Sequence, residues 1–302
     1  MGDHSWSDEQ ASRVYKAVQE EAQRARVAAQ FLPLFGPVDP STVGVPRLAL
    51  DDEPAPQGSP SLRRLRVNSE PDLLLTTISV LVSLHARELA DPELLAALTM
   101  FRRAANCIAR IEDALILLGQ SQNLPLQARL PAIGRIPQIY SLSGATYSEG
   151  LLPDPNQPGN PPPPRLIVQI PQPQQNLSPG DALVDAIIQA TVDLESAGQL
   201  GPYACVLGNQ LFTRLVAPAT NQLVIPRDRV LPFLDGPLVR SSVLPPLQGV
   251  VVALAGNPVE LVVASDLAVN YLQTTLEPRA VFRVSERLAL RIKDFSAIAV
   301  LS

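Results

Sequence analysis

The sequence is poor in the residues that build most reactive sites. It has two histidines and two cysteines, Cys107 and Cys205, in 302 residues. Two histidines are too few for a zinc centre, and two cysteines exclude a disulfide framework. We therefore expect two buried thiols in a reducing compartment and no metal ion.

Glycine motifs that cradle phosphates or expose a nucleophile are also missing. The chain contains no G-x-G-x-x-G, no G-x-x-x-x-G-K-[ST] and no G-x-S-x-G, so dinucleotide, P-loop and α/β-hydrolase sites lack their scaffolds. The neighbouring acids Glu112 and Asp113 would point about 100° apart on a helix, and we interpret them as solvated or paired with Arg110. These absences predict a binding or building protein without a cofactor, and not an enzyme.

Aromatic residues and long apolar runs are scarce as well. Aromatics make up 4% of the chain against 46% apolar residues, so aliphatic side chains must fill the core. No apolar run is long enough to span a bilayer, and the acidic start MGDHSWSDEQ does not resemble a secretory signal. A net charge of -5 argues against nucleic acid as the main partner. We expect a soluble, cytoplasmic protein.

What the sequence does contain is three segments with helical periodicity. Ser7 is the expected cap of the first, which the stretch GPVDP stops. The second runs from the capping Asp91 to Gly119 and should be roughly 40 Å long, a structural spine. The third lies between Ser178 and Gly198. Strand-like runs such as YACVLG, GVVVALA, VELVVAS and the closing RLALRIKDFSAIAVL gather late, which indicates an α+β fold.

Two regions have the composition of loops. Residues 45–75 form an arm whose apolar positions would find partners elsewhere, and whose basic cluster Arg63, Arg64 and Arg66 is either a solvated face or a salt-bridging surface for a neighbouring subunit. Residues 120–177 are punctuated by proline. We interpret that stretch as a surface excursion, with a ligand for a proline-reading module as the alternative.

Several stretches, taken in order, resemble the encapsulins, which are nanocompartment shell proteins with the capsid fold of the Hong Kong 97 type of phage. The most specific is SPGDALVDAIIQATVDLESAGQLGPYACVL, accompanied by FGPVDPSTVGVP, FRRAANCIARIEDALILLG, ASDLAVNYL and ERLALRIKDFSAIAVL. The resemblance implies this division of the chain: 1–44, the N-terminal helix and start of the P-domain; 45–77, the E-loop; 78–119, the P-domain spine helix; 120–239, the A-domain with a proline-rich insertion at 120–177; and 240–302, the P-domain strands.

The resemblance also implies a function. The chain would be a shell subunit that assembles with its copies into an icosahedral compartment and encapsulates cargo enzymes through a C-terminal targeting peptide. Family cargo is often a ferritin-like protein or a dye-decolourising peroxidase, which implies iron storage or protection against oxidative stress. Alternatives are a prophage major capsid protein that packages DNA, and a bacteriocin or protease-like enzyme, for which we see no nucleophile.

Candidate binding residues follow from position in the family. The family's polar peptide-capturing residues are replaced here by Ala28, Ala29 and Pro33, so we expect a more apolar docking groove. Flavin, bound by some members beside an aromatic side chain, is not expected, because Trp6 is the sole tryptophan and lies near the terminus. The expected cargo-peptide residues, for which core packing is the alternative, are Phe31, Leu34, Leu267, Val269 and Tyr271.

The five-fold pore loop of the family corresponds to an uncharged stretch of this chain. Without a ring of carboxylates or cations, such a pore would select by size and only weakly by charge. Its residues are Ala217, Pro218, Ala219, Thr220 and Asn221.

Overall fold

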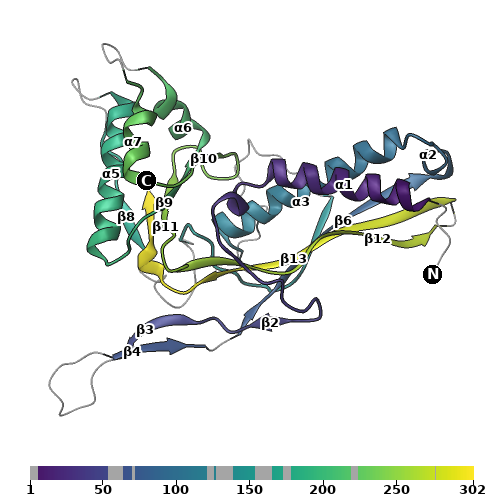
Figure 1. The fold of residues 1–302 in the computed structure, drawn as a ribbon, viewed down its shortest axis with the longest axis horizontal. Coiled ribbons are helices and arrows are strands. Elements are labelled where there is room, and N and C mark those ends of the chain that lie inside the picture. The colour runs from purple at the N-terminus through teal and green to yellow at the C-terminus, as the bar shows by residue number, and fades with distance from the viewer. Residues whose placement is uncertain are drawn as a thin grey trace.

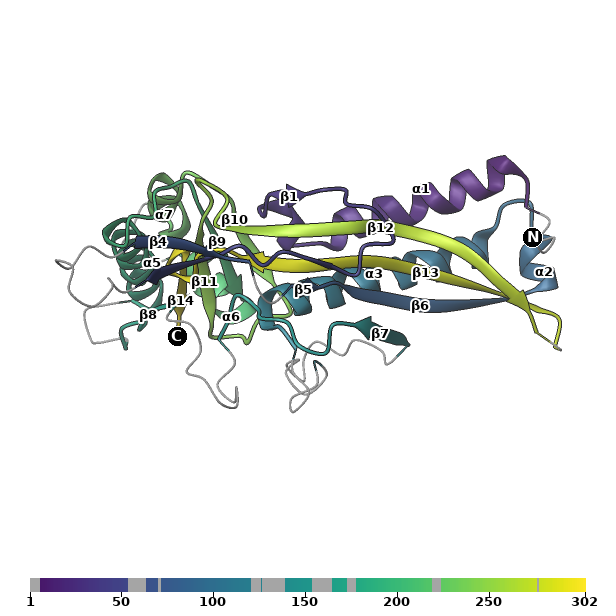
Figure 2. The same cartoon turned by 90° about the horizontal axis from the view of Figure 1, so that it is seen from below.

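The fold is elongated, with a long sheet at one end and a smaller helix-covered sheet at the other (Figures 1 and 2). It is seen in a computed structural model. The structure describes residues 6–53, 64–69, 72–120, 126, 139–153, 165–172, 178–218, 224–275 and 277–302.

The long sheet contains five strands in the order β1-β12-β13-β6-β7. On β13, buried Val284 and Leu288 alternate with more exposed Arg283 and Arg287, but every residue from Leu288 to Ile292 is buried. The two longest strands pair antiparallel over nearly their whole length, and only β1 pairs parallel, with β12. The bounds are β1 (Leu34–Phe35), β12 (Val259–Thr274), β13 (Arg279–Ile292), β6 (Thr76–His85) and β7 (Tyr140–Gly144).

Two helices, α1 (Asp8–Ala25) and α3 (Leu95–Leu118), lie side by side on one face of this sheet (Figures 1 and 2). Ser7 caps α1 as expected, since its Oγ accepts a hydrogen bond from the Gln10 amide at 3.2 Å. The spine helix starts later than expected because the Asp91 carboxylate accepts the amides of both Glu93 and Leu95, each at 3.0 Å. The short helix α2 (Ala86–Leu89) joins β6 to this turn.

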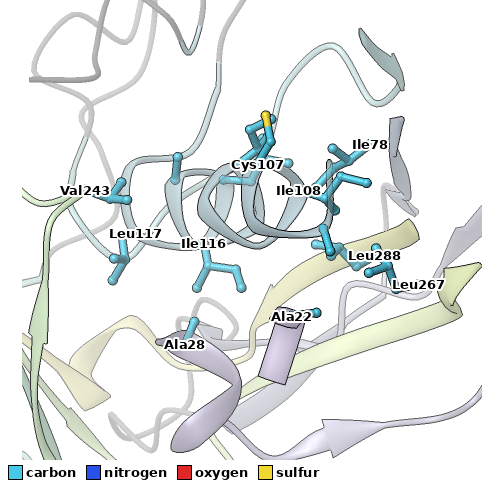
Figure 3. Packing of buried hydrophobic residues seen from close by; sticks show 14 of the residues in the cluster. Ala22, Ala28, Ile78, Cys107, Ile108, Ile116, Leu117, Val243, Leu267 and Leu288 are labelled. Carbon is cyan, nitrogen blue, oxygen red and sulfur yellow. The ribbon is translucent and has the colours of Figure 1, made fainter. Parts of the chain in front are cut away.

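The main core lies between these helices and the long sheet. Ile108 and Ile116 of α3 meet Leu288 of β13 and Leu267 of β12 in one cluster, together with Ala22 of α1 (Figure 3). Close packing of such fully buried side chains is the principal stabilising term of the fold.

The second sheet contains five strands in the order β10-β9-β11-β14-β8, and helices cover it (Figure 1). Every residue of β9 and β11 is buried, as expected for central strands covered on both faces. The strands are β8 (Leu166–Val168), β9 (Tyr203–Gly208), β10 (Leu238–Ser241), β11 (Gly249–Ala253) and β14 (Ile298–Leu301), and the helices α5 (Pro179–Ser196), α6 (Asn209–Val216) and α7 (Pro226–Leu234).

Strands after residue 240 do not all share one sheet. β12 and β13 lie in the long sheet, whereas β11 and β14 lie in the second, where Val250 pairs with both Val206 and Val300. The expected boundary at residue 240 therefore does not separate the two sheets. The physical reason is that β11 and β14 are buried along their whole length. Strand periodicity does not reveal that β11 pairs with β9 and that β14 pairs with β11 and β8.

The arm is a hairpin of β3 (Ala49–Glu53) and β4 (Arg64–Asn68) that extends away from both sheets (Figure 1). A smaller pair, β2 (Gly44–Val45) and β5 (Leu73–Leu74), connects it to the body. Arg63 lies outside the described residues, as does most of the proline-rich stretch. Two short 3-10 turns, η1 (Ala28–Gln30) and η2 (Phe295–Ala297), complete the described elements.

Candidate functional site

Arg26 joins the end of α1 to the spine helix and to the long sheet. Its Nε donates to Oε2 of Glu112 at 2.6 Å, and its Nη2 donates to Oε1 of Glu286 at 2.5 Å and to Oδ1 of Asp266 at 3.2 Å. The side chains of Glu112 and Glu286 are 0% and 1% exposed. Since an unpaired buried carboxylate is very costly, this Arg26 cluster holds three distant segments in one arrangement.

Asp113, the next residue on the spine helix, fixes the turn that follows α1. Its Oδ1 accepts the backbone amides of Val27 at 3.0 Å and Ala28 at 2.8 Å. The interpretation of Glu112 and Asp113 as solvated, or as partners of Arg110, is therefore wrong. Their partners are more than eighty residues away in the sequence, beyond the reach of helical periodicity.

The burial of this cluster changes its acid–base behaviour. Burial raises the pKa of Asp113 to about 8, and the charge of Glu112 adds to the rise, while the amides of Ala28 and Val27 oppose it. Burial likewise raises the pKa of Glu112 against the attraction of Arg26.

Glu286 is affected more strongly, because burial and then the charge of Glu112 raise its pKa well above the usual value. Burial tends to lower the pKa of Arg26, but Glu286, Glu112 and Asp266 together raise it. The guanidinium therefore stays charged. The Arg26 cluster therefore has a structural role. Its two buried glutamates, Glu112 and Glu286, are not accessible to a substrate.

The expected cargo-peptide residues do not meet at one point. Phe31 and Leu267 are buried in the main core, and Val269 and Tyr271 are partly buried against it. Leu34 is 65% exposed and pairs with Leu261, ten residues before Tyr271 on the same strand, or roughly 33 Å away at the usual rise. Only Leu34 presents most of its surface to a ligand.

The exposed part of this region is the strand β1, at the edge of the long sheet. Phe35 is 42% exposed and packs its ring under the guanidinium of Arg291, 4.1 Å from the ring centroid. The Pro33 carbonyl accepts the Leu261 amide at 2.9 Å, which holds β1 against β12. Our sequence reasoning missed Phe35 and Arg291, although the adjacent bulky pair in LPLFG was a visible signal.

Further along β12, the first helix covers the strand. Gln19 Nε2 donates to the carbonyl of Leu267 at 2.8 Å. The helix therefore satisfies one backbone carbonyl of β12 that would otherwise stay open to a peptide.

The expected pore loop follows α6. Ala217 ends that helix, with its amide donating to the Thr213 carbonyl at 3.0 Å, and Pro218 follows. Ala219, Thr220 and Asn221 lie outside the described residues. The described flanks are apolar and exposed at Val216 and Val224.

In the described residues, no group of three or more His, Cys, Asp or Glu side chains is placed to hold a metal ion. Among the same residues, no helix is both long and apolar enough to cross a membrane.

Comparison with known proteins agrees with the sequence resemblance. Residues 167–289 match a family described as "Encapsulating protein for peroxidase". A stretch of 124 residues is 33% identical to the type 1 encapsulin shell protein of Myxococcus xanthus and covers 41% of this chain. The resemblance to the encapsulins is confirmed. The match spans 42% of that encapsulin's length.

Solved structures show the fold over a much longer range. A virus-like particle protein from Pyrococcus furiosus superposes with a TM-score of 0.66 and 14% identity, covering 96% of this chain and 98% of that one. The capsid of Myoviridae phage XM1 superposes with a TM-score of 0.56 and 14% identity, over 89% of this chain and 88% of that one. The fold is therefore the Hong Kong 97 capsid fold, which encapsulins share with tailed phages.

Proposed function

We propose that this chain is an encapsulin shell subunit that assembles with copies of itself into a closed icosahedral compartment, and that it is not an enzyme. The observation that carries the proposal is the β3–β4 hairpin. It extends from the body as a two-stranded ribbon (Figure 1), and a ribbon of this kind is marginally stable alone. A neighbouring subunit would cover it.

Exposed apolar side chains elsewhere support the same conclusion. Within the described residues, several of them occur on the hairpin, on β6, on β12 and near the ends of α6 and α7. Exposed apolar side chains of this kind are available for contacts with a neighbouring subunit. Closed symmetry would bury the same surfaces in every copy. Examples are Leu81, Leu272, Val216 and Phe233.

The experiment is size-exclusion chromatography with light scattering, followed by electron microscopy of the full chain. A closed particle of uniform size supports the proposal, and a well-folded monomer at high concentration contradicts it. The alternative prophage capsid shares the fold, so absorbance of the purified particle decides between them. Co-purifying DNA favours the phage protein, and protein cargo favours the compartment.

We further infer that the β1 edge captures the targeting peptide of a cargo enzyme, a ferritin-like protein or a peroxidase, in a cytoplasmic compartment. The support is chemical, because Leu34 and Phe35 form an exposed apolar pair on an edge strand, where an extended peptide could add as a further strand. A family description that mentions peroxidase encapsulation agrees with this. Cargo capture would serve iron storage or protection against oxidative stress.

The pore proposal rests on the sequence of the loop after α6, from Ala217 to Asn221, which has no charged side chain. An uncharged rim would pass small solutes by size. Flux of an anion and a cation of equal size into cargo-loaded particles should be similar, and strong selectivity for either would contradict the proposal.

A further inference from the structure

A groove of about 390 Å³ lies between α1 and α3. Four of its lining residues are arginines, three from the spine helix and one from α1. Two further polar side chains and one cysteine complete the wall. The seven residues are Arg24, Arg102, Arg103, Arg110, Glu21, Asn106 and Cys107, and we call this the arginine groove.

The groove carries an excess of positive charge in a chain whose net charge is -5. Four arginines and one glutamate leave a formal charge of +3. Glu21 is engaged, since it pairs with Arg24 and accepts a hydrogen bond from Asn106 Nδ2 at 2.9 Å. Arg102, Arg103 and Arg110 form no ion pair within the described part of the chain, so their donors are available to a ligand.

Cys107 also lines the groove, and it is buried. Burial raises the pKa of the Cys107 thiol to about 11, while the charges of Arg110 and Arg103 act in the opposite direction. Both guanidinium groups are therefore close enough to influence one buried atom, and a ligand in the groove would meet their combined field.

The arginines are spaced along the groove. Arg102, Asn106 and Arg110 stand four residues apart on one helix, so the two arginines are separated by about 12 Å along its axis. In an extended peptide, carboxylates four residues apart are separated by about 13 Å. Two acidic side chains of such a peptide could each meet an arginine, with the Asn106 amide between them.

We propose that the arginine groove binds an extended acidic peptide segment of a partner protein. No aromatic side chain lines the groove, so it lacks the stacking platforms that single-stranded nucleic acid uses. The acidic run at 51–53 of the same molecule cannot fill it, because the hairpin that carries this run points away from both helices (Figure 1). The proposal does not depend on assembly into a shell.

The test is co-expression of the full chain with a fluorescent protein that carries a tail of alternating glutamate and serine, long enough to span the groove. A matched tail of glutamine and serine is the neutral control. Co-expression lets the tail bind before any particle closes, and the ratio of the two proteins after purification can be read whether the chain elutes as a particle or as a subunit. We expect the acidic tail to be retained and the neutral tail to be lost.

Variants locate the site. R102Q/R110Q should reduce retention about tenfold or more, because two charge-assisted contacts are removed. The variant R102K/R110K keeps the positive charge, so it should still retain part of the acidic-tailed protein. R227Q/R283Q removes two exposed arginines elsewhere and should change nothing. Circular dichroism verifies that each variant is folded, and R103Q provides a second, milder variant.

Three results would overturn the proposal. They are equal retention of the acidic and neutral tails, retention unchanged in folded R102Q/R110Q, and nucleic acid that co-purifies with the wild type but not with R102Q/R110Q. The last result would assign the groove to phosphodiesters instead of carboxylates.

Discussion

Leu50 and Val67 stand directly opposite each other on the β3–β4 hairpin, and each is about half exposed, at 48% and 54%. A facing apolar pair of this kind normally packs against a core. Here it projects from the body, held there by the bond from the Leu50 amide to the Lys293 carbonyl at 2.8 Å. The two strands of the hairpin are therefore paired, but their apolar side chains stay exposed until another surface covers them.

Placing charge on this pair should block assembly. We expect L50E/V67E to remain folded but to elute as a small species, because two carboxylates would have to be buried at the contact with a neighbour. Light scattering measures the change. The conservative variant L50I/V67I is the control and should still assemble. Normal particles from L50E/V67E would show that the hairpin is dispensable.

Removing Arg26 should destabilise the fold strongly. R26M leaves Glu112 and Glu286 buried without their cation, a loss of roughly 3–5 kcal/mol in the free energy of unfolding. Urea denaturation measures it. The control is K16M, which removes a cation from an exposed pair with Glu20 and should cost less than about 0.5 kcal/mol.

A second variant tests the cause of that loss. Adding E112Q and E286Q to R26M should recover part of the stability, because neutral amides are less costly to bury than unpaired carboxylates. If the free energy of unfolding falls no more in R26M than in K16M, the Arg26 cluster does not hold the three segments together.

Stability should fall as pH rises through the neutral range. The pKa of Asp113 is about 8 in the folded chain and about 4 when unfolded. Between about pH 4 and pH 8 the Asp113 carboxyl group is therefore protonated in the folded state and ionised in the unfolded state. The stabilisation is complete below about pH 4 and is lost as pH approaches 8, by up to about 1.4 kcal/mol per pH unit.

Urea titrations at several pH values check this slope, with D113N as the comparison. The amide cannot ionise, so D113N should be less stable at low pH but should show a flatter profile. A wild-type profile that rises from pH 4 to 8, or an equally steep fall in D113N, would contradict the assignment.

Polar substitution of the β1 edge should prevent cargo capture without preventing assembly. L34S/F35S removes the exposed apolar pair and should abolish co-purification of a tailed cargo protein, measured by gel densitometry of purified particles. L200S is the matched control, since Leu200 is equally exposed at 65% but lies outside both sheets. Full loading of L34S/F35S particles with the cargo protein would show that the docking site lies elsewhere.

Local sequence determined the elements of this fold well. The Ser7 cap and the long apolar period of the spine helix each depend on neighbours within a few residues, so the pattern carries the information. The start of the spine helix was predicted too early because Asp91 caps a turn before the helix begins. The order of several short stretches, and no single motif, indicated the capsid fold.

Only the tertiary structure decided which distant residues meet. Nothing near Arg26 in the sequence indicates that Glu112, 86 residues later, and Glu286, 260 residues later, share its guanidinium. The same holds for β11, which joins the second sheet, and for the exposed pair at Leu34 and Phe35. Periodicity shows which face of a helix or strand is apolar. Which side chains are buried and which charges pair depends on the segments that pack against that face. That is settled only when the whole chain has folded.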